Sequence, residues 1–356
     1  MPPVLKMRKS IGIPTIFTRN LFSGQSLTEN KTDRLQLPLE DGVAAGLIIR
    51  MSGTLTVSAG TPVLQPNGVE RLLGNISLKG KRGVGPSIDF ASPVPTMMFA
   101  KYNTYAYGRI NPRTELATSG TAQAFNTTVI VPFSDPRLVE SERAKTGLNL
   151  TKYEDMWLQL DHGQYWATNA GGDTIATGTA GVTYTFPTAP TYSVDLMFYP
   201  KDQVDPDSWD EVGTEPVFEY QNQVVTSGPN TLDIILQGKG KQARTFMEFV
   251  NRSSVQAETQ ANIFSSIQQI QFKLGTTPYV YPLAGALQDL NQQQPGVYTN
   301  LTAAPTGYFV YDWNPHGYVR SMPNFYNIKD RVHLNPQNPS PTSTDIMARV
   351  LHVTYR

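Results

Sequence analysis

Histidines often bind metals or transfer protons, and the chain has four of them, His162, His316, His333 and His352. No two share the spacing of a metal-binding pair, and there is no His-Glu-x-x-His sequence. His333 and His352 fall within strand-like runs, where a structural histidine with satisfied hydrogen bonds is the common case. The chain has no cysteine, which excludes thiol catalysis, disulfides and cysteine metal sites. We therefore predict no metal site.

Carboxylates form two clusters, at 154–155 and 205–211. A glycoside hydrolase needs two such groups facing each other across a cleft, and carboxylate oxygens also suit calcium. Asp205, Asp207 and Asp210 lack the glycine of an EF-hand turn, although a calcium site there stays open. Because both clusters fall in predicted loops or a linker, solvated turn residues are the simpler interpretation. No Gly-x-Ser-x-Gly sequence is present, so we predict that the protein is not an enzyme and has no cofactor.

Basic residues adjoin glycines at 80–83 (Gly-Lys-Arg-Gly) and at 238–241 (Gly-Lys-Gly-Lys), a composition that can bind phosphate. Neither stretch has the Walker spacing, so a basic turn between two strands is the default interpretation. Lys plus Arg and Asp plus Glu both number 29, and no overall field favours nucleic acid. We therefore expect no sequence-specific nucleic-acid binding. No apolar run reaches the roughly 18 residues that span a bilayer.

Few residues of the chain are charged. They make up only 16% of it, against roughly 25% in an ordinary soluble domain. Uncharged polar residues, 28 glycines and 27 prolines take their place. A surface with so few charges is poorly protected against association, so the composition favours a protein that assembles with copies of itself.

The elements that must position these residues are strands. Short alternating or β-branched runs bounded by Gly and Pro predict them along the whole chain. In the first half these runs are 35–39, 47–57, 72–80, 128–131, 156–160 and 193–199. In the second half they are 217–220, 232–236, 245–250, 267–275, 308–312, 331–335 and 348–355. A short helix is predicted within 90–107, and a Gly- and Thr-rich tract at 168–190 predicts an exposed hairpin or loop.

The second half repeats the order of the first. Ile76 corresponds to Ile270 with an offset of 194, and Val194 corresponds to Val350 with an offset of 156. The shared order is the evidence for a duplication, because any single pair of short strands resembles many others. Short strands with frequent turns favour antiparallel sheets packed face to face. We therefore predict an all-β fold of two consecutive eight-stranded jelly-roll β-sandwiches with short helical insertions.

The predicted organisation is an N-terminal arm at 1–21, a first jelly roll at 22–200, a linker at 201–215 and a second jelly roll at 216–356. All charges of the arm are basic, and they are Lys6, Arg8, Lys9 and Arg19. A solvated terminus is one interpretation of this segment. A tether to anionic lipid headgroups or packaged nucleic acid is the other.

Two stretches carry a resemblance to a known family. They are Val131-Pro132-Phe133-Ser134-Asp135-Pro136-Arg137 and Trp157-Leu158-Gln159-Leu160-Asp161-His162-Gly163. With the repeated order of strands, they resemble the double jelly-roll major capsid proteins of tailless, membrane-containing double-stranded DNA viruses of the tectivirus- and adenovirus-like lineage. The family-like loop consists of Pro132, Phe133, Asp135, Pro136 and Arg137. The architectural likeness covers residues 22–356, whereas the likeness of individual residues covers a small part of them.

The resemblance implies that the two jelly rolls stand side by side and that three chains form a homotrimer of pseudo-hexagonal outline. Such trimers would tile an icosahedral shell, with neighbouring trimers and minor capsid or penton proteins as partners. The shell would enclose an internal membrane and a double-stranded DNA genome, and the N-terminal arm would face that membrane. The protein would reside in the virion, and in the host cytoplasm during assembly. Loops within 168–190 and 222–230 would form outward towers.

An alternative function is a two-domain carbohydrate-binding or glycoside-processing β-sandwich protein, in which Trp166, Trp209 or Trp313 stacks on sugars. The absence of a secretory signal pattern and of a supported acid pair weighs against it. A tail or spike protein built of sandwiches is a third class, and the repetitive fibrous segments expected of that class are not found.

Overall fold

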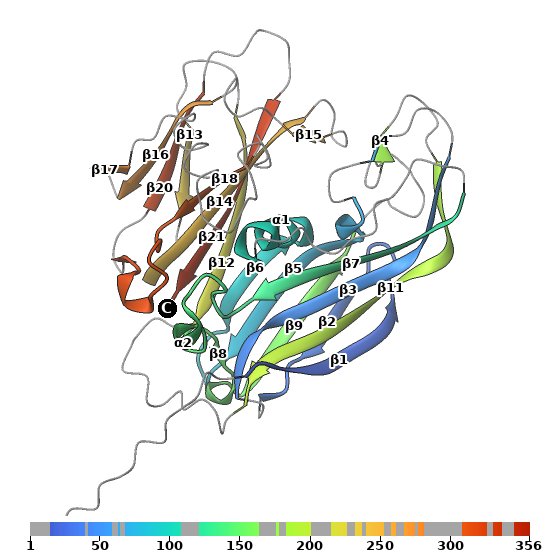
Figure 1. The fold of residues 1–356 in the computed structure, drawn as a ribbon, viewed down its shortest axis with the longest axis horizontal. Helices are drawn as coiled ribbons and strands as arrows, with labels where there is room; N and C mark the ends of the chain where they lie inside the picture. Colours follow the sequence, from blue (N-terminus) through green and yellow to red (C-terminus); the bar gives the residue numbers. More distant parts are fainter. Residues whose placement is uncertain are drawn as a thin grey trace, which may run out of the picture.

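The computed structural model describes most of the chain as strands, arranged in two sandwiches that lie side by side (Figure 1). The described residues are 15–39, 42–58, 63–64, 68–107, 121–163, 176–177, 183–200, 215–225, 232–236, 240–252, 258–260, 267–274, 277–280, 308–325, 330–336 and 345–356. Within these ranges, no helix has both the length and the hydropathy needed to cross a membrane.

The first sandwich consists of two sheets. One has the strand order β1-β11-β3-β7, with β8 also paired to β3, and the other has the order β2-β9-β5-β6. The strands are β1 (Phe17–Ser26), β2 (Thr32–Gln36), β3 (Val43–Ser58), β5 (Leu73–Lys81), β6 (Ile88–Pro95), β7 (Gln123–Pro132), β8 (Leu148–Asn149), β9 (Asp155–His162) and β11 (Thr183–Tyr199). A separate short ladder joins β4 (Val63–Leu64) to β10 (Ala176–Thr177).

The second sandwich also consists of two sheets. One has the order β12-β21-β14-β18, and the other has the order β13-β20-β16-β17. The strands are β12 (Pro216–Val225), β13 (Leu232–Leu236), β14 (Gly240–Arg252), β16 (Ile267–Leu274), β17 (Thr277–Val280), β18 (Tyr308–Asp312), β20 (Asp330–Pro336) and β21 (Asp345–Tyr355). Two short strands, β15 (Glu258–Gln260) and β19 (Asn324–Phe325), also pair with β14.

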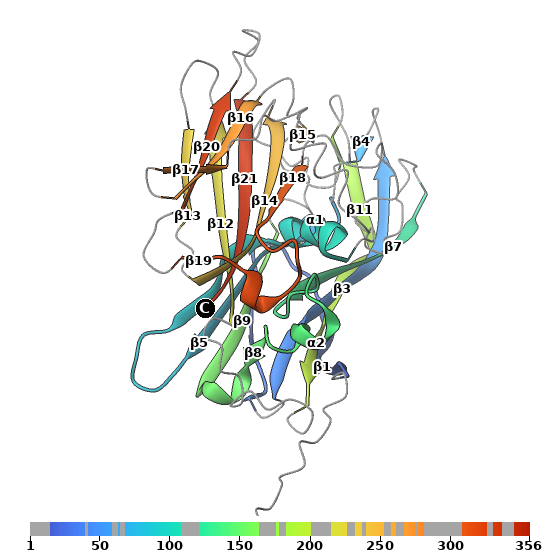
Figure 2. The same cartoon turned by 60° about the vertical axis from the view of Figure 1, so that its left-hand side comes forward.

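The two sandwiches have the same connectivity (Figures 1 and 2). When the eight main strands of each are numbered along the chain, both have one sheet of order 1-8-3-6 and one of order 2-7-4-5. This is the jelly-roll arrangement. Ile76 lies on β5 and Ile270 on the equivalent β16, while Val194 lies on β11 and Val350 on the equivalent β21. The predicted fold class and the predicted duplication are therefore confirmed.

The core follows from alternation along the strands. Side chains of a strand point to opposite faces in turn, and β9 alternates between half-buried and buried residues along its whole length. On β3, Leu47, Ile49 and Met51 are buried. The apolar cluster to which they belong continues into the second sandwich through residues such as Phe218 and Phe246. The two sandwiches therefore share one hydrophobic core.

Helix α1 (Thr96–Tyr107) lies between the two sandwiches (Figure 2). It follows β6 directly, after Pro95 ends that strand. The region predicted as helical, 90–107, is thus a strand up to residue 95 and a helix from residue 96. Buried residues occur on all sides of α1, including Phe99, Lys101 and Tyr102, as expected of a helix enclosed by protein. The other short helices are α2 (Glu140–Arg143), η2 (Glu70–Leu72), η3 (Leu150–Lys152) and η5 (Val319–Ser321).

Several predicted boundaries differ from the structure. Strand β1 begins at Phe17 and pairs with β11, so residues 17–21 belong to the first sheet rather than to an arm. Strand β3 begins at Val43, four residues before the run predicted at 47–57. Strand β11 already begins at Thr183, within the tract predicted as a hairpin or loop. The linker at 201–214 and most of the predicted tower loops lie outside the described residues.

Candidate assembly site: the junction between the sandwiches

The junction begins where one sheet of the first sandwich continues into the second. Strand β6 lies beside β12 in parallel, with Ala91 opposite Phe218. The ring of Phe218 packs edge-on against Phe99 of α1, with the ring centroids 5.3 Å apart. Because both aromatic side chains are almost fully buried, the contact removes a large apolar area from water. The junction is therefore apolar at its base.

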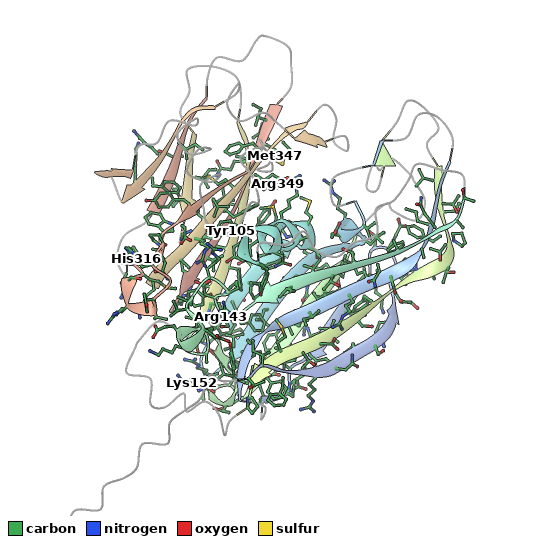
Figure 3. All side chains as sticks on the ribbon, viewed as in Figure 1. Tyr105, Arg143, Lys152, His316, Met347 and Arg349 are labelled. Carbon is green, nitrogen blue, oxygen red and sulfur yellow. The ribbon has the colours of Figure 1, made fainter. Side chains whose placement is uncertain are left out.

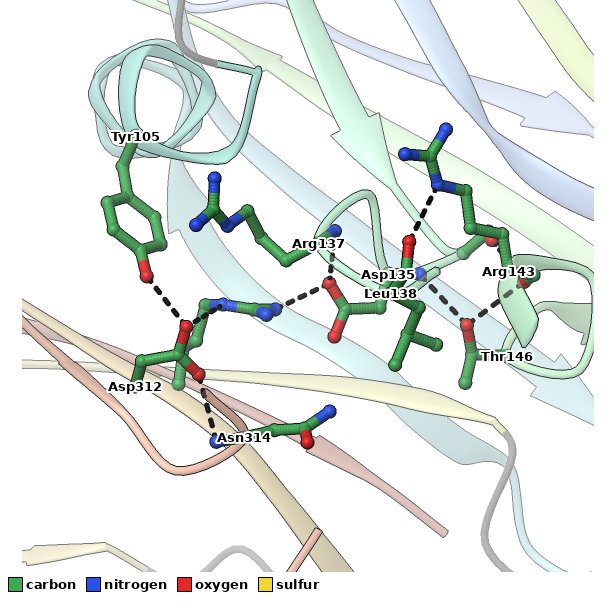
Figure 4. A network of polar contacts seen from close by, with 10 residues as sticks. Tyr105, Asp135, Arg137, Leu138, Arg143, Thr146, Asp312 and Asn314 are labelled. Carbon is green, nitrogen blue, oxygen red and sulfur yellow. Dashed lines mark hydrogen bonds and ion pairs between the residues drawn. The ribbon is translucent and has the colours of Figure 1, made fainter. Parts of the chain in front are cut away.

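A buried arginine lies at the centre of the junction (Figure 4). Arg244 comes from β14 of the second sandwich, and its guanidinium forms an ion pair with the carboxylate of Asp135, which follows β7 of the first. Its Nε atom lies 3.5 Å from Oδ2 of Asp312, at the end of β18. The hydroxyl of Tyr105 on α1 donates a hydrogen bond of 2.9 Å to the same Oδ2. One buried cation thus connects residues from both sandwiches and from the helix between them.

Local backbone structure positions Asp135. Strand β7 ends at Pro132, and the backbone amide groups of Phe133 and Ser134 both donate to the carbonyl of Ala45, at 2.9 and 2.8 Å. The amide of Asp135 then donates to Oγ1 of Thr146 at 2.9 Å. These bonds turn the chain out of the sheet and direct the carboxylate into the junction.

Arg137 completes this turn. Its backbone amide donates to Oδ1 of Asp135 at 2.9 Å. Its guanidinium lies over the ring of Tyr105, 5.5 Å from the centroid, at a distance where a cation and an aromatic face attract. The family-like loop and helix α1 therefore hold each other in place.

Burial changes the ionisation of these groups. Burial alone would lower the pKa of Arg244, but the carboxylates of Asp135 and Asp312 more than offset that effect, and the pKa is raised. Burial raises the pKa of Tyr102 to about 12 and raises that of Tyr105 as well. The arginine therefore stays charged and both tyrosines stay neutral at ordinary pH. A buried charge of this kind is tolerated only when opposite charges face it.

A second buried ion cluster lies along α1. Lys101 of α1 forms an ion pair with Glu248 of β14, and Arg349 of β21 lies 3.4 Å from the other oxygen of Glu248. Burial lowers the pKa of Lys101, and the Glu248 carboxylate opposes that shift. Figure 3 labels Tyr105 on α1 and Arg349 on β21 of the second sandwich. The helix of the first sandwich is thus fixed to the second by charge as well as by apolar packing.

The loops that follow β7 and β18 also contact each other. The amide of Val139 donates to the carbonyl of Gly317 at 2.9 Å. The amide of Val319 donates to Oε2 of Glu142 at 3.2 Å. These two loops occupy equivalent places in the two sandwiches, so the junction is built from elements that the duplication produced twice.

The predicted site residues are divided between the junction and the N-terminal region. The structure brings the family-like loop, Pro132, Phe133, Asp135, Pro136 and Arg137, into the junction. Arg19 lies on β1, away from the arm to which it was assigned. Lys6, Arg8 and Lys9 lie outside the described residues.

The sequence analysis did not identify Arg244, Asp312, Lys101 or Glu248. A signal was present in this strand, because Glu248 interrupts the apolar run from Phe246 to Val250, and Arg244 lies just before that run. An ionisable residue at such a position needs a buried partner. The partner of Arg244 was not predictable, because Asp135 lies 109 residues away from it in the chain.

The histidines have structural surroundings. His352 is buried, its Nε2 lies 2.6 Å from Oε1 of Gln242 and its Nδ1 lies 2.9 Å from Oγ1 of Thr245. Burial lowers the pKa of His352 to about 3, so this imidazole is neutral. The imidazole of His162 contacts Asp33 at 3.1 Å and the backbone of Thr28. In the described part of the chain, no group of three or more His, Asp and Glu residues could hold a metal ion.

One of the three tryptophans that the carbohydrate-binding alternative requires is not accessible. Trp313 is only 5% exposed, and its indole N–H donates to Oγ1 of Thr245 at 3.0 Å. The side chain belongs to the core of the second sandwich and is not available to stack on a sugar. Trp166 and Trp209 lie outside the described residues. In the basic turn after β5, which has a composition that can bind phosphate, Arg82 already has partners within the chain. It forms an ion pair with Glu215 and donates a hydrogen bond of 2.6 Å to the hydroxyl of Tyr153.

No family model and no curated protein matches the sequence. Solved structures do match over nearly the whole chain. The major capsid protein of Sulfolobus Turreted Icosahedral Virus has a TM-score of 0.62 at 15% identity, over 96% of both chains. The PBCV-1 virus capsid has a TM-score of 0.57 at 12% identity, over 96% of this chain and 94% of that one. The major capsid protein P2 of bacteriophage PM2 has a TM-score of 0.53 at 11% identity, over 96% of this chain and 97% of that one.

The fold of this protein is therefore that of the double jelly-roll viral capsid proteins. At these sequence identities the likeness concerns the fold, and it agrees with the repeated strand order described above.

Proposed function

We propose that the protein is a major capsid protein, whose trimers of pseudo-hexagonal outline tile an icosahedral shell around an internal membrane and a double-stranded DNA genome. One observation carries the proposal: two sandwiches of identical connectivity are fixed side by side by a shared core and a buried network of charges. Three such chains would place six equivalent sandwiches in a ring. The likeness of the whole chain to viral capsid proteins supports the same conclusion.

The role is structural rather than catalytic. The buried charges at the junction have opposite charges as partners, as in Arg244 with Asp135 and Lys101 with Glu248. Groups paired in this way fix the geometry of the junction. The protein would act by its shape, without a cofactor, in the virion and, before assembly, in the host cytoplasm.

The partners would be copies of this chain and the proteins that fill the vertices. Only 16% of the residues are charged, which lowers the cost of bringing equal surfaces together. An assembly that uses the flanks of six sandwiches would bury several thousand Å² in total, as obligate interfaces of roughly 2,000–5,000 Å² do. Minor capsid and penton proteins would complete the shell.

The N-terminal arm would contact the internal membrane. Lys6, Arg8 and Lys9 lie within four consecutive residues, and each basic residue near an anionic lipid surface contributes about 1 kcal/mol. Arg19 is part of β1 and is not included in this contact. The arm would therefore end before Phe17, where the first strand starts.

Light scattering on the purified protein tests the proposal. The expected result is a particle of about three times the chain mass of 39.3 kDa at micromolar concentration, which forms larger assemblies as the concentration rises. A stable monomer over the whole concentration range would contradict the proposal.

A further inference from the structure

The junction inside the chain leaves two equivalent strand edges. Strand β6 is the fifth main strand of the first sandwich and lies beside β12, the first main strand of the second. The equivalent of β6 in the second sandwich is β17, and the equivalent of β12 in the first is β1. Among the described residues, β17 pairs only with β16, and β1 pairs only with β11. Within the part of the chain that the structure describes, one edge of each strand therefore has no neighbouring strand.

The open edge of β1 is exposed, whereas its equivalent in the second sandwich is covered. Along β1 most side chains are exposed, including Phe17 at 46%. At the start of β12, Val217 is 7% and Phe218 is 1% exposed, because the first sandwich and α1 lie against them. An exposed edge strand with one charged residue in ten, Arg19, is a site where another chain can add.

A groove follows this open edge. It has a volume of about 400 Å³, and it is lined by Arg19, Asn20, Leu21, Gln36, Leu37, Pro38 and Leu39. These residues belong to β1, to the last residue of β2 and to the three residues that follow it. Strands β1 and β2 are the edge strands of the two facing sheets. The groove is thus the unclosed side of the first sandwich.

We propose that β17 of one copy lies parallel to β1 of a second copy, so that the junction found within the chain is repeated between chains. The proposal deepens the capsid function proposed above, because it names the surface through which the trimer forms. The sheet β13-β20-β16-β17 of one chain would then continue into the sheet β1-β11-β3-β7 of the next. The same relation would connect each sandwich to the following one around the ring.

The two edges are suitably placed for such a contact. In both Figure 1 and Figure 2, β17 and β1 lie on opposite flanks of the molecule. A contact between different surfaces of identical chains is head-to-tail, and it forms a ring when the rotation closes. Strand β17 contains Pro278, just as β6 contains Pro93 and Pro95. Proline cannot donate a backbone hydrogen bond, so packing rather than a long ladder would hold the contact, as at Ala91 and Phe218 inside the chain.

Cysteine cross-linking tests this contact directly, because the natural chain contains no cysteine. Six double variants would combine Phe17→Cys, Thr18→Cys or Arg19→Cys on β1 with Tyr279→Cys or Val280→Cys on β17. A disulfide forms only when the Cβ atoms approach to about 3.5–4.5 Å. After mild oxidation, we expect at least one combination to convert more than half of the protein into dimers and trimers on a non-reducing gel.

Matched controls define the result. Each single variant should stay monomeric on the gel, and so should β1 variants combined with Ile235→Cys, which lies on β13 at the opposite edge of the same sheet. Light scattering before oxidation reports whether the variants assemble.

Three results would overturn the proposal. A trimer in which none of the six combinations cross-links would contradict this contact and leave the capsid function standing. A single β1 variant that links to itself would show a symmetric contact instead. A monomer at all concentrations would contradict both this contact and the capsid function.

Discussion

Replacing Asp135 by Asn tests whether the buried charges hold the two sandwiches together. Asparagine has nearly the same shape, and its carbonyl can still accept the hydrogen bond from the amide of Arg137. The substitution therefore removes mainly the negative charge that faces Arg244. The guanidinium keeps Asp312 as a partner at 3.5 Å.

The expected loss follows from the burial of the pair. Both side chains are fully buried, and removal of one partner from a buried ion pair costs about 3–5 kcal/mol. Because Asp312 remains beside Arg244, we expect a value near the lower limit, about 3 kcal/mol. For a chain of 356 residues, the unfolding entropy is about 0.75 kcal/mol per kelvin, so the melting temperature should fall by about 4 °C.

Scanning calorimetry measures this difference, with Arg50→Gln as the matched control. Arg50 forms an ion pair with Asp195 on the outer face of the first sandwich, and its side chain is 47% exposed. Because the arginine is in contact with solvent and Asp195 keeps its hydrogen bond from Asn20, loss of this pair should cost about 1 kcal/mol or less, which corresponds to about 1 °C. A double variant, Asp135→Leu with Arg244→Met, should recover part of the lost stability, because it removes both charges of the pair, while Asp312 keeps its hydrogen bonds from the Tyr105 hydroxyl and the Asn314 amide.

Two results would refute this reasoning. Asp135→Asn could prove no more destabilising than Arg50→Gln, or the apolar double variant could melt well below Asp135→Asn. The first result would show that the ion pair contributes little to the junction, and the second that an unpaired buried charge is not the cause of the loss.

Three further predictions concern other parts of the molecule. Burial lowers the pKa of His352 to about 3, so the neutral imidazole contributes its full stability above pH 6.5. As the pH falls from 6.5 toward 3, the free energy of unfolding should decrease, by roughly 3 kcal/mol at pH 4. Urea titrations of His352→Asn should lack this pH dependence, and a dependence equal to that of the natural protein would contradict the prediction. Asn103→Ala removes two hydrogen bonds of 2.7 Å to the backbone of Ile130 on β7, and we expect a loss of about 2–3 kcal/mol in the same titration, whereas a loss below 1 kcal/mol would show that water replaces both bonds. Deletion of residues 1–14 should leave the melting temperature unchanged, because β1 begins at Phe17, and should reduce shell assembly or membrane attachment; full virion yield from the shortened protein would contradict the role of the arm.

The sequence predicted the strands well because their apolar residues alternate and their ends carry glycine or proline. The run at 156–160 is an example, and it forms the centre of β9. The duplication was also readable, because the order of strands is preserved even though the loops differ in length. Strand β1 was missed as a whole, because the apolar residues within 17–26 do not alternate. Most of that strand is exposed, so no buried face imposes a pattern on its sequence.

The junction was predictable only in part. The loop at 132–137 stood out by its composition, but nothing local shows that Asp135 would face Arg244. Long-range ion pairs depend on how the two sandwiches pack against each other, and strand patterns in the sequence do not show that packing. The helix at 90–107 was predicted without its first boundary, because Phe90 and Val94 suit a strand and a helix equally well.

Electron microscopy of the purified oligomer tests the central claim most directly. If equivalent sandwiches pack in the same way within and between chains, class averages should show a particle of hexagonal outline with six lobes, formed by three chains. A two-lobed particle containing one chain, or an oligomer whose lobes are not equivalent, would contradict the account.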